Sequence, residues 1–228
     1  MTNKPLPRRE LLKTAGLTLA GAALACSGLG YAATRTPEIE TPEFIFRKDD
    51  SMNKRVLIAY ATRTGSTLEI AAAIGETLSG RGCVVDVKPV KSQPSLNGYS
   101  AVLLGSAIRM GSWLPEMVDY IKANQSALTQ SISMGMPVAL FTVHMLNTGD
   151  DQASRAARLA YLDRIRPLLG KVEEAYFTGV IDMEKLSFLD RMMVKMVKSP
   201  IGDHRDWNKI RNWAPAFLHN PLTCTRRR

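Results

Sequence analysis

The segment that most constrains the fold of this chain is RVLIAYATRTGSTLEIAA, at residues 55–72. It begins with a short and nearly continuous apolar run at 56–60, which is typical of a strand buried on both faces of a parallel sheet. A hydroxyl-rich, turn-like stretch follows at 62–67. The residues after it have the spacing of an amphipathic helix, with Leu68 and Ala71 on the same face. The segment therefore predicts a strand, a loop and a helix in succession.

The loop in the middle of this segment has the composition of an anion-binding site. A helix N-terminus presents backbone N–H groups without intrahelical partners and carries partial positive charge, so it suits a phosphate dianion. Four of the six loop residues bear hydroxyl groups, and Gly65 allows the backbone to curl closely around an anion. The residues expected to hold the anion are Thr62, Arg63, Thr64, Gly65, Ser66 and Thr67.

Other phosphate-binding motifs do not fit this loop. A Walker-type loop requires Gly-x-x-x-x-Gly-Lys-Ser/Thr, and the loop contains no lysine. A dinucleotide fingerprint requires Gly-x-Gly-x-x-Gly, which is also absent. An ordinary βα turn with a Ser or Thr cap explains the same residues without a ligand, and on the loop alone both interpretations stay open. Arg63 either adds positive charge near the phosphate or is a solvated loop residue.

The pattern Thr-x-Thr-Gly-x-Thr at 62–67 resembles the loop that holds the FMN phosphate in the flavodoxins, which use hydroxyls and backbone amides rather than lysine. The longer string YATRTGSTLEIA at 60–71 is similar to one branch, the flavodoxin-like, menaquinone-dependent protoporphyrinogen oxidases. The string GSAIRMG at 105–111 resembles the second, flavin-side loop of that branch. The resemblance extends over roughly residues 54–218.

This resemblance implies FMN as the cofactor and two further loops around its isoalloxazine ring. The residues expected near the ring are Ser106, Ala107, Ile108, Arg109, Met110 and Gly111 in one loop and Thr142, Val143 and His144 in the other. Backbone groups near Arg109 and Gly111 would tune the flavin potential through hydrogen bonds. Trp113 either packs on the ring or begins the core contact of the next helix. The three histidines are scattered along the chain and are expected at the surface or in loops.

The rest of the chain continues the alternation of strands and helices. Further strands are predicted at 83–90, 101–105, 137–143 and 175–181, and helices at 114–126 and 152–169. Such alternation pairs strands in parallel through right-handed crossovers. With the resemblance, it predicts an α/β fold, a flavodoxin-like, doubly wound, five-stranded parallel sheet with helices on both faces. The loops at 62–67, 106–113 and 144–151 all follow strands, so they should meet at the ligand-binding edge.

A basic amphipathic helix is predicted at 183–199. Its apolar stripe consists of Leu186, Leu189, Met193, Met196 and Val197. Another face carries Arg191, Lys195 and Lys198. Such a helix is suited to lie on anionic lipid and to bring a quinone partner near. The alternative is a crossover helix that packs on the sheet.

The first 33 residues have the pattern of a targeting segment rather than of a folded element. Paired arginines, Arg8 and Arg9, precede an apolar run of small residues at 15–25 that is too short to span a bilayer. This twin-arginine pattern predicts export of the folded protein, with cleavage after Ala32 or, in a competing interpretation, lipid attachment at Cys26. The structural alternative is an apolar helix packed on the domain.

The predicted organisation is a signal segment at 1–33, an extended linker at 34–52, one FMN-binding domain at 53–220 and a basic tail at 221–228. Within the linker, residues 44–46 could dock on the domain edge. The protein is expected in the periplasm or on the outer side of the membrane. Initiation at Met52 would instead give a cytoplasmic protein bound peripherally to the membrane.

Charge and composition restrict the partners. The 228 residues carry a formal net charge of +9, and without residues 1–32 there remain 26 basic and 20 acidic residues. This excess favours anionic partners or an anionic membrane surface. There is no basic repeat with interleaved aromatic residues and no zinc spacing, so nucleic-acid binding is not indicated. The three cysteines form no Cys-x-x-Cys motif, and neither a metal site nor a Ser-His-Asp set is expected.

The function implied by the resemblance is that of an FMN-dependent oxidoreductase similar to the quinone-linked protoporphyrinogen IX dehydrogenases. Such an enzyme moves electrons from its substrate through FMN to a quinone. The alternative is an exported electron carrier of the flavodoxin type that acts between redox protein partners, although carriers of that type are usually acidic. A flavin-free domain with a binding role is a third possibility.

Overall fold

The structure is a computed structural model that describes residues 39–47 and 54–219. These residues belong to two units, 39–182 with 199–219 in one and 183–198 in the other. The signal segment predicted at 1–33 and the basic tail predicted at 221–228 lie outside the described residues.

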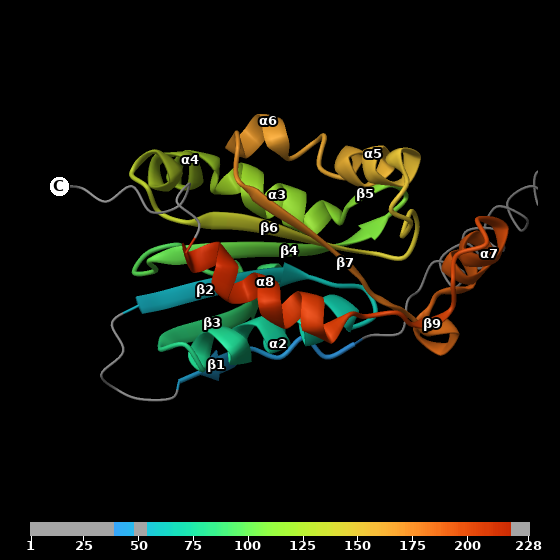
Figure 1. The fold of residues 1–228 in the computed structure, drawn as a ribbon, viewed down its shortest axis with the longest axis horizontal. Coiled ribbons are helices and arrows are strands. Elements are labelled where there is room, and N and C mark those ends of the chain that lie inside the picture. Colours follow the sequence, from blue (N-terminus) through green and yellow to red (C-terminus); the bar gives the residue numbers. More distant parts are fainter. Residues whose placement is uncertain (1–38, 48–53, 220–228) are drawn as a thin grey trace, which may run out of the picture. The chain divides into compact units, whose positions relative to one another are not determined.

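A mostly parallel sheet forms the centre of the larger unit (Figure 1). Its strand order is β1-β3-β2-β4-β6-β7, and the short strand β5 pairs with β4 outside this path. The strands are β1 (Phe44–Phe46), β2 (Lys54–Ala61), β3 (Cys83–Pro89), β4 (Ala101–Arg109), β5 (Ser112–Trp113), β6 (Val138–His144) and β7 (Glu173–Thr178). Strands β3, β2, β4, β6 and β7 are parallel, whereas β1 and β5 run antiparallel to their neighbours. The predicted five-stranded parallel sheet is thus confirmed, with an added edge strand.

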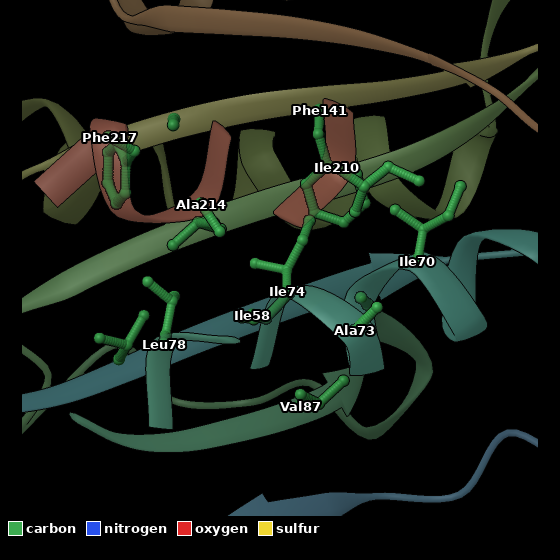
Figure 2. Packing of buried hydrophobic residues seen from close by; sticks show 14 of the residues in the cluster. Ile58, Ile70, Ala73, Ile74, Leu78, Val87, Phe141, Ile210, Ala214 and Phe217 are labelled. Atoms are coloured by element: carbon green, nitrogen blue, oxygen red, sulfur yellow. The ribbon is translucent and has the colours of Figure 1, made fainter. Parts of the chain in front are cut away.

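Helices cover both faces of this sheet (Figure 1). One face carries α2 (Ser66–Ser79) and α8 (Trp207–His219), and the other carries α3 (Pro115–Ala123), α4 (Gln125–Ser133), α5 (Gln152–Ala160) and α6 (Arg166–Leu169). Figure 2 shows Ile70 and Ile74 of α2 and Ile210 of α8 packed over the strand residues Ile58 and Phe141, and all five side chains are fully buried.

The apolar run in β2 is continuous because the strand serves two cores. Successive side chains of a strand point to opposite faces. Ile58 therefore joins the core under α2 and α8, while Leu57 and Ala59 join the core under α3 and α6. All three residues are fully buried, as predicted for a central parallel strand.

The remaining elements are short. A 3-10 turn, η1 (Val90–Ser92), follows β3, and the strands β8 (Val180–Ile181) and β9 (Gly202–Asp203) form a separate antiparallel pair. The unit at 183–198 contains η2 (Met183–Lys185) and α7 (Phe188–Met196). The helix predicted at 183–199 is therefore shorter than expected, and it begins after Ser187, whose hydroxyl accepts the Asp190 N–H (3.1 Å) as an N-cap.

The helix predicted at 114–126 consists of two helices. Asn124, between α3 and α4, has a non-helical backbone (φ −106°, ψ 11°). The Tyr120 carbonyl at the end of α3 accepts both the Asn124 backbone N–H (3.1 Å) and the Asn124 side-chain amide (2.9 Å). The break is made by local hydrogen bonding that an apolar pattern does not report.

The helix predicted at 152–169 is also interrupted, between α5 and α6. Pro167 in the first turn of α6 has no N–H to continue the α5 ladder, and its ring would clash with the preceding turn of a continuous helix. The predicted apolar stripe is divided accordingly, because Leu162 and Ile165 are buried whereas Leu159 is 50% exposed.

Boundaries near the carboxyl ends of the strands differ from the prediction as well. The first half of the loop predicted at 106–113 is strand, since β4 extends to Arg109 and a turn at Met110 and Gly111 leads into β5. Gly179 divides the strand predicted at 175–181 into β7 and β8. Residues 44–46, expected to dock on the domain edge from within a linker, form the edge strand β1.

Candidate functional site

Strand register brings the three predicted loops to the same edge of the sheet. At the ends of the strands, Ala61 of β2 pairs with Ser106 of β4, and Ser106 pairs with Thr142 of β6. The chain passes from β2 to β3 on one side of β2 and returns as β4 on the other side, so the strand order reverses beside β2. Ligands of open parallel sheets bind beyond the carboxyl ends of the strands at such a reversal. This edge is the candidate site.

The first loop ends in an open helix N-terminus. Gly65, the N-cap of α2, has a left-handed backbone (φ 96°) that a residue with a β-carbon adopts only with strain. Its N–H donates to Thr62 Oγ1 (3.0 Å), and its carbonyl accepts the Glu69 N–H (3.1 Å), which starts the helix. Among the residues that the structure describes, no side-chain hydrogen bond caps α2, so its first-turn amides have no side-chain acceptor there.

The first turn of α2 also contains the buried hydroxyl group of Thr67. Thr67 is fully buried, and within the described part of the chain its Oγ1 has no hydrogen-bond partner. A buried donor without a partner costs about 1–3 kcal/mol. Ser66 and Thr62 beside it are also buried, whereas Arg63 and Thr64 are half-buried. Buried hydroxyls beside an uncapped helix N-terminus fit a bound phosphate oxygen better than an ordinary βα turn.

The second loop is a tight hairpin between β4 and β5. Its two turn residues, Met110 (φ 52°) and Gly111 (φ 75°), both have positive φ, as the favoured two-residue hairpin turns require. The Met110 side chain is 82% exposed at the tip. Ala107, Ile108 and Arg109 are half-buried on the strand that leads to this tip. The hairpin therefore presents an apolar and a basic side chain at the site edge.

Three of the predicted site residues use their side chains within the fold. Ser106 Oγ donates to the Ala107 carbonyl (2.9 Å) and accepts the Leu114 N–H (3.0 Å). Thr142 Oγ1 accepts from Trp113 Nε1 (2.9 Å), and Trp113 is 2% exposed. Val143 is buried at the end of β6. Trp113 therefore makes the core contact that was one of its two predicted roles, and Ser106, Thr142 and Val143 offer the site their backbone.

His144 is not the surface or loop residue that its isolation in the sequence indicated. It is the last residue of β6 and is 4% exposed. Because a carbonyl only accepts, the Nδ1–H donates to the Leu146 carbonyl (2.8 Å), and the ring centroid lies 5.8 Å from that of Tyr161. Burial is the main cause that lowers the pKa of His144, and it favours the neutral imidazole.

The third loop is held by two residues that the sequence pattern did not single out. Tyr161 is buried, and its hydroxyl accepts from Asn147 Nδ2 (2.9 Å). Arg158 Nη1 donates to the carbonyls of Asn147 and Gly149, the latter at 2.6 Å. In the sequence, both residues belong to a predicted helix, and no local signal indicates that they reach back to the preceding loop.

The C-terminal part of the chain also reaches the first loop. A β-carbon on Gly179 would lie 3.3 Å from Ser66 Oγ and 2.7 Å from a methyl group of Val143. Arg205 forms an ion pair with Glu69 in the first turn of α2. Sequence reasoning gave neither Gly179 nor Arg205 a place at the site, because their proximity to residues 66–69 is set only by tertiary packing.

The described residues contain no group of three or more His, Cys, Asp or Glu side chains that could hold a metal ion. Within residues 39–47 and 54–219, no helix is long and apolar enough to cross a membrane. The site therefore offers amides, hydroxyls and cationic side chains, which suit an anionic organic ligand.

The chain is similar to several known proteins. A family model described as "Flavodoxin domain" matches residues 57–208. The protoporphyrinogen IX dehydrogenase [quinone] of Escherichia coli K12 is 24% identical over 181 residues, which cover 72% of this chain and 95% of that protein. The protein of the same name from Leishmania major is 27% identical over 191 residues, which cover 75% of this chain and 78% of that protein. Oxidised flavodoxin 1 from Bacillus cereus aligns with 73% of this chain and 99% of its own at 16% identity and a TM-score of 0.46.

Proposed function

The chain belongs to the flavodoxin domain family, and from this premise we propose that it is an oxidoreductase that passes electrons from a reduced substrate through FMN to a quinone. A flavodoxin domain binds FMN, and the bound flavin supplies the electron chemistry while the protein binds and orients it. The observation that carries the proposal is the first loop, where the buried Thr67 hydroxyl has no hydrogen-bond partner and the N-terminus of α2 no side-chain cap among residues 39–47 and 54–219.

In this proposal each loop has a separate task. The hydroxyls at 62–67 and the first-turn amides of α2 hold the phosphate, and Arg63 adds positive charge beside it. The hairpin at 107–111 would hold the isoalloxazine ring through Ile108 or Met110. The backbone at 142–147 would also hold the ring, and His144 fixes that loop through the Leu146 carbonyl.

The phosphate assignment is tested by replacing one hydroxyl. Thr67→Val keeps the side-chain volume and removes the orphan oxygen, so we expect about a tenfold weaker FMN affinity, the size of one hydrogen bond to a charged group. Riboflavin, which lacks the phosphate, should bind the variant and the native protein equally. Thr77→Val, at the far end of α2 where the hydroxyl donates to the Ala73 carbonyl, is the matched control and should leave both affinities unchanged. Equal FMN affinity for Thr67→Val and native protein would contradict the assignment.

The substrate and acceptor are proposed from the relatives. Proteins named protoporphyrinogen IX dehydrogenase [quinone] match 72–75% of this chain, which supports a porphyrinogen as electron donor and a quinone as acceptor. Anaerobic mixing of the FMN-loaded protein with protoporphyrinogen should bleach the flavin, and a menaquinone analogue should restore its colour. Bleaching no faster than the uncatalysed background would exclude this substrate. An exported carrier between redox proteins, the alternative function, would then be supported if a reduced protein donor bleached the flavin.

Contact with a membrane is proposed through α7. None of its residues is buried, and Phe188, Met192 and Met196 are 61%, 55% and 69% exposed. Arg191 and Lys195 add positive charge to the same short helix, which complements an anionic lipid surface. A quinone acceptor is dissolved in the bilayer, so contact of α7 with lipid would bring the protein to the membrane that contains this acceptor.

Vesicle binding tests this contact. The protein should sediment with vesicles that contain phosphatidylglycerol and not with pure phosphatidylcholine, and salt should weaken the binding. Met192→Gln combined with Met196→Gln should reduce it. Met134→Gln, at a residue that is 66% exposed in the larger unit, should leave it unchanged. Undiminished binding of the double variant would exclude α7 as the contact.

We further propose that the paired arginines Arg8 and Arg9 direct export. These residues lie outside the described part of the chain, so the proposal depends on the sequence pattern alone. Changing both to lysine should retain the protein in the cytoplasm, as measured by cell fractionation. An unaltered distribution would favour a cytoplasmic, peripheral location instead.

A further inference from the structure

The first turn of α2 contains a carboxylate where an anion is to bind. Glu69 lies four residues after the Gly65 N-cap, and its Oε1 would lie 4.0 Å from a β-carbon on Gly65. A carboxylate in the first turn stabilises a helix that has no ligand. The same carboxylate repels a phosphate dianion held by the same turn, and because the Glu69 side chain is 52% exposed, water screens part of this repulsion.

Arg205 meets this carboxylate from the other end of the chain. It forms an ion pair with Glu69 Oε2, and the two residues are 136 positions apart in the sequence. Its guanidinium also donates to both carboxylate oxygens of Asp203, from Nε at 2.9 Å and from Nη2 at 2.6 Å. The ring of Trp207 lies beneath it, with the guanidinium carbon 4.4 Å from the ring centroid. The Arg205 side chain is only 10% exposed, so this charge is fixed in position.

The segment that carries Arg205 is itself attached to the site edge. The His204 N–H donates to the Gly179 carbonyl (3.1 Å), and the Gly179 N–H donates to the His144 carbonyl (3.1 Å). Gly179 in turn lies against Ser66, the first residue of α2. Hydrogen bonds thus join the segment of Arg205 to the end of β6, and the close approach of Gly179 to Ser66 places this segment beside the first loop.

We propose that Arg205 is a positioning residue for the phosphate loop, which neutralises Glu69 and holds its carboxylate away from the bound phosphate. The inference depends on the proposed FMN site. According to this inference, the affinity for FMN depends on a residue of the C-terminal segment as well as on the residues of the loop. Asp203 and Trp207 keep the guanidinium oriented toward Glu69.

The test compares FMN with riboflavin in a double-mutant cycle. Arg205→Gln should weaken FMN binding about tenfold, the size of coupling found between neighbouring charges, and should leave riboflavin binding unchanged. Arg205→Gln combined with Glu69→Gln should restore FMN affinity, because the unpaired carboxylate is then absent. Arg205→Lys should retain most of it. Arg211→Gln, which removes the other guanidinium near the Trp207 ring (5.6 Å from its centroid), should have no effect.

Four results would overturn the inference. If Arg205→Gln weakens FMN and riboflavin equally, Arg205 is only structural. If the loss is specific for FMN but Glu69→Gln does not restore it, the arginine contacts the phosphate directly. If Arg205→Gln binds both ligands as the native protein does, the ion pair has no role. If the native protein itself binds neither ligand, the proposed function fails, and the inference fails with it.

Discussion

Individual residues at the carboxyl edge of the sheet show how closely the site and the core are connected. Gly105 is the last residue of the apolar part of β4, directly before Ser106. A β-carbon at this position would lie 1.8 Å from Cζ of Phe141, which is fully buried. The glycine is therefore required by the aromatic ring of the neighbouring strand.

This contact predicts the effect of one added methyl group. Gly105→Ala should lower the free energy of unfolding by about 2–3 kcal/mol, because overpacking forces a buried ring to move. Gly80→Ala is the matched control, since its backbone is helical (φ −59°) and the nearest contact of the added carbon would be 3.4 Å. Urea unfolding followed by circular dichroism measures both. Equal stability of the two variants would show that the Phe141 ring can move to accommodate the added methyl group.

His144 predicts a pH dependence. Burial, Arg158 and Lys209 lower its pKa, while the hydrogen bond to the Leu146 carbonyl opposes them and the Tyr161 ring packs nearby. Below about pH 6.5, therefore, His144 is protonated in the unfolded chain while it is still neutral in the folded protein. The free energy of unfolding consequently decreases as the pH falls. Above about pH 7.5 the histidine is neutral in both states and contributes no pH dependence.

His144→Gln should remove this contribution. The free energy of unfolding of the variant should decrease less than that of the native protein between pH 7 and pH 5, and both proteins share the titration of the carboxylates. Urea unfolding at several pH values measures the difference. Parallel profiles would mean that folding does not lower the pKa of His144.

At the scale of elements, the short strand β1 completes the sheet. Phe46 pairs with Val85 of β3, and its ring lies against α2, with Cδ2 2.9 Å from the position of a β-carbon on Gly75. Ile45, the residue before Phe46, points outward and is 65% exposed. The strand covers an edge that would otherwise expose unpaired backbone groups.

The two neighbouring residues of β1 therefore predict opposite outcomes. Phe46→Ala should destabilise the protein by about 2 kcal/mol, less than for a fully buried phenylalanine because the side chain is half-buried. Ile45→Ala should change stability by less than about 0.5 kcal/mol. Thermal unfolding of the two variants in the full chain tests the strand. An equal, small effect would mean that β1 does not contribute to the stability of the sheet.

In the larger unit as a whole, the last helix, α8, packs into the same core as the central strands. Ile210, Ala214 and Phe217 of α8 are fully buried in the same core as Ile58 of β2, as Figure 2 shows. The ends of this unit therefore share one core, and we expect them to unfold together.

Ile210→Ala tests this cooperativity. It should cost about 2–4 kcal/mol, and the transitions followed by tryptophan fluorescence and by far-ultraviolet circular dichroism should shift together. Asn212→Ala, at an exposed position of the same helix, should leave both transitions unchanged. Separation of the two transitions would show that α8 unfolds on its own.

Local sequence patterns predicted the alternation of strands and helices, the five-stranded parallel sheet and the position of the loop at 62–67. Each of these depends on neighbours in the chain, because a strand buried on both faces must be apolar throughout and an open helix N-terminus must follow a turn. The family, and with it FMN as the cofactor, follows from the same local strings.

The residues that surround this loop are known only from the tertiary structure. The burial of His144, the attachment of the third loop by Arg158 and Tyr161, and the ion pair between Arg205 and Glu69 join residues that no local pattern relates. The breaks in two predicted helices likewise depend on single residues, Asn124 and Pro167. The periodic spacing of apolar residues continues across both positions and does not indicate the breaks. Periodicity reports which face of an element is buried, but partners distant in the chain are chosen by packing.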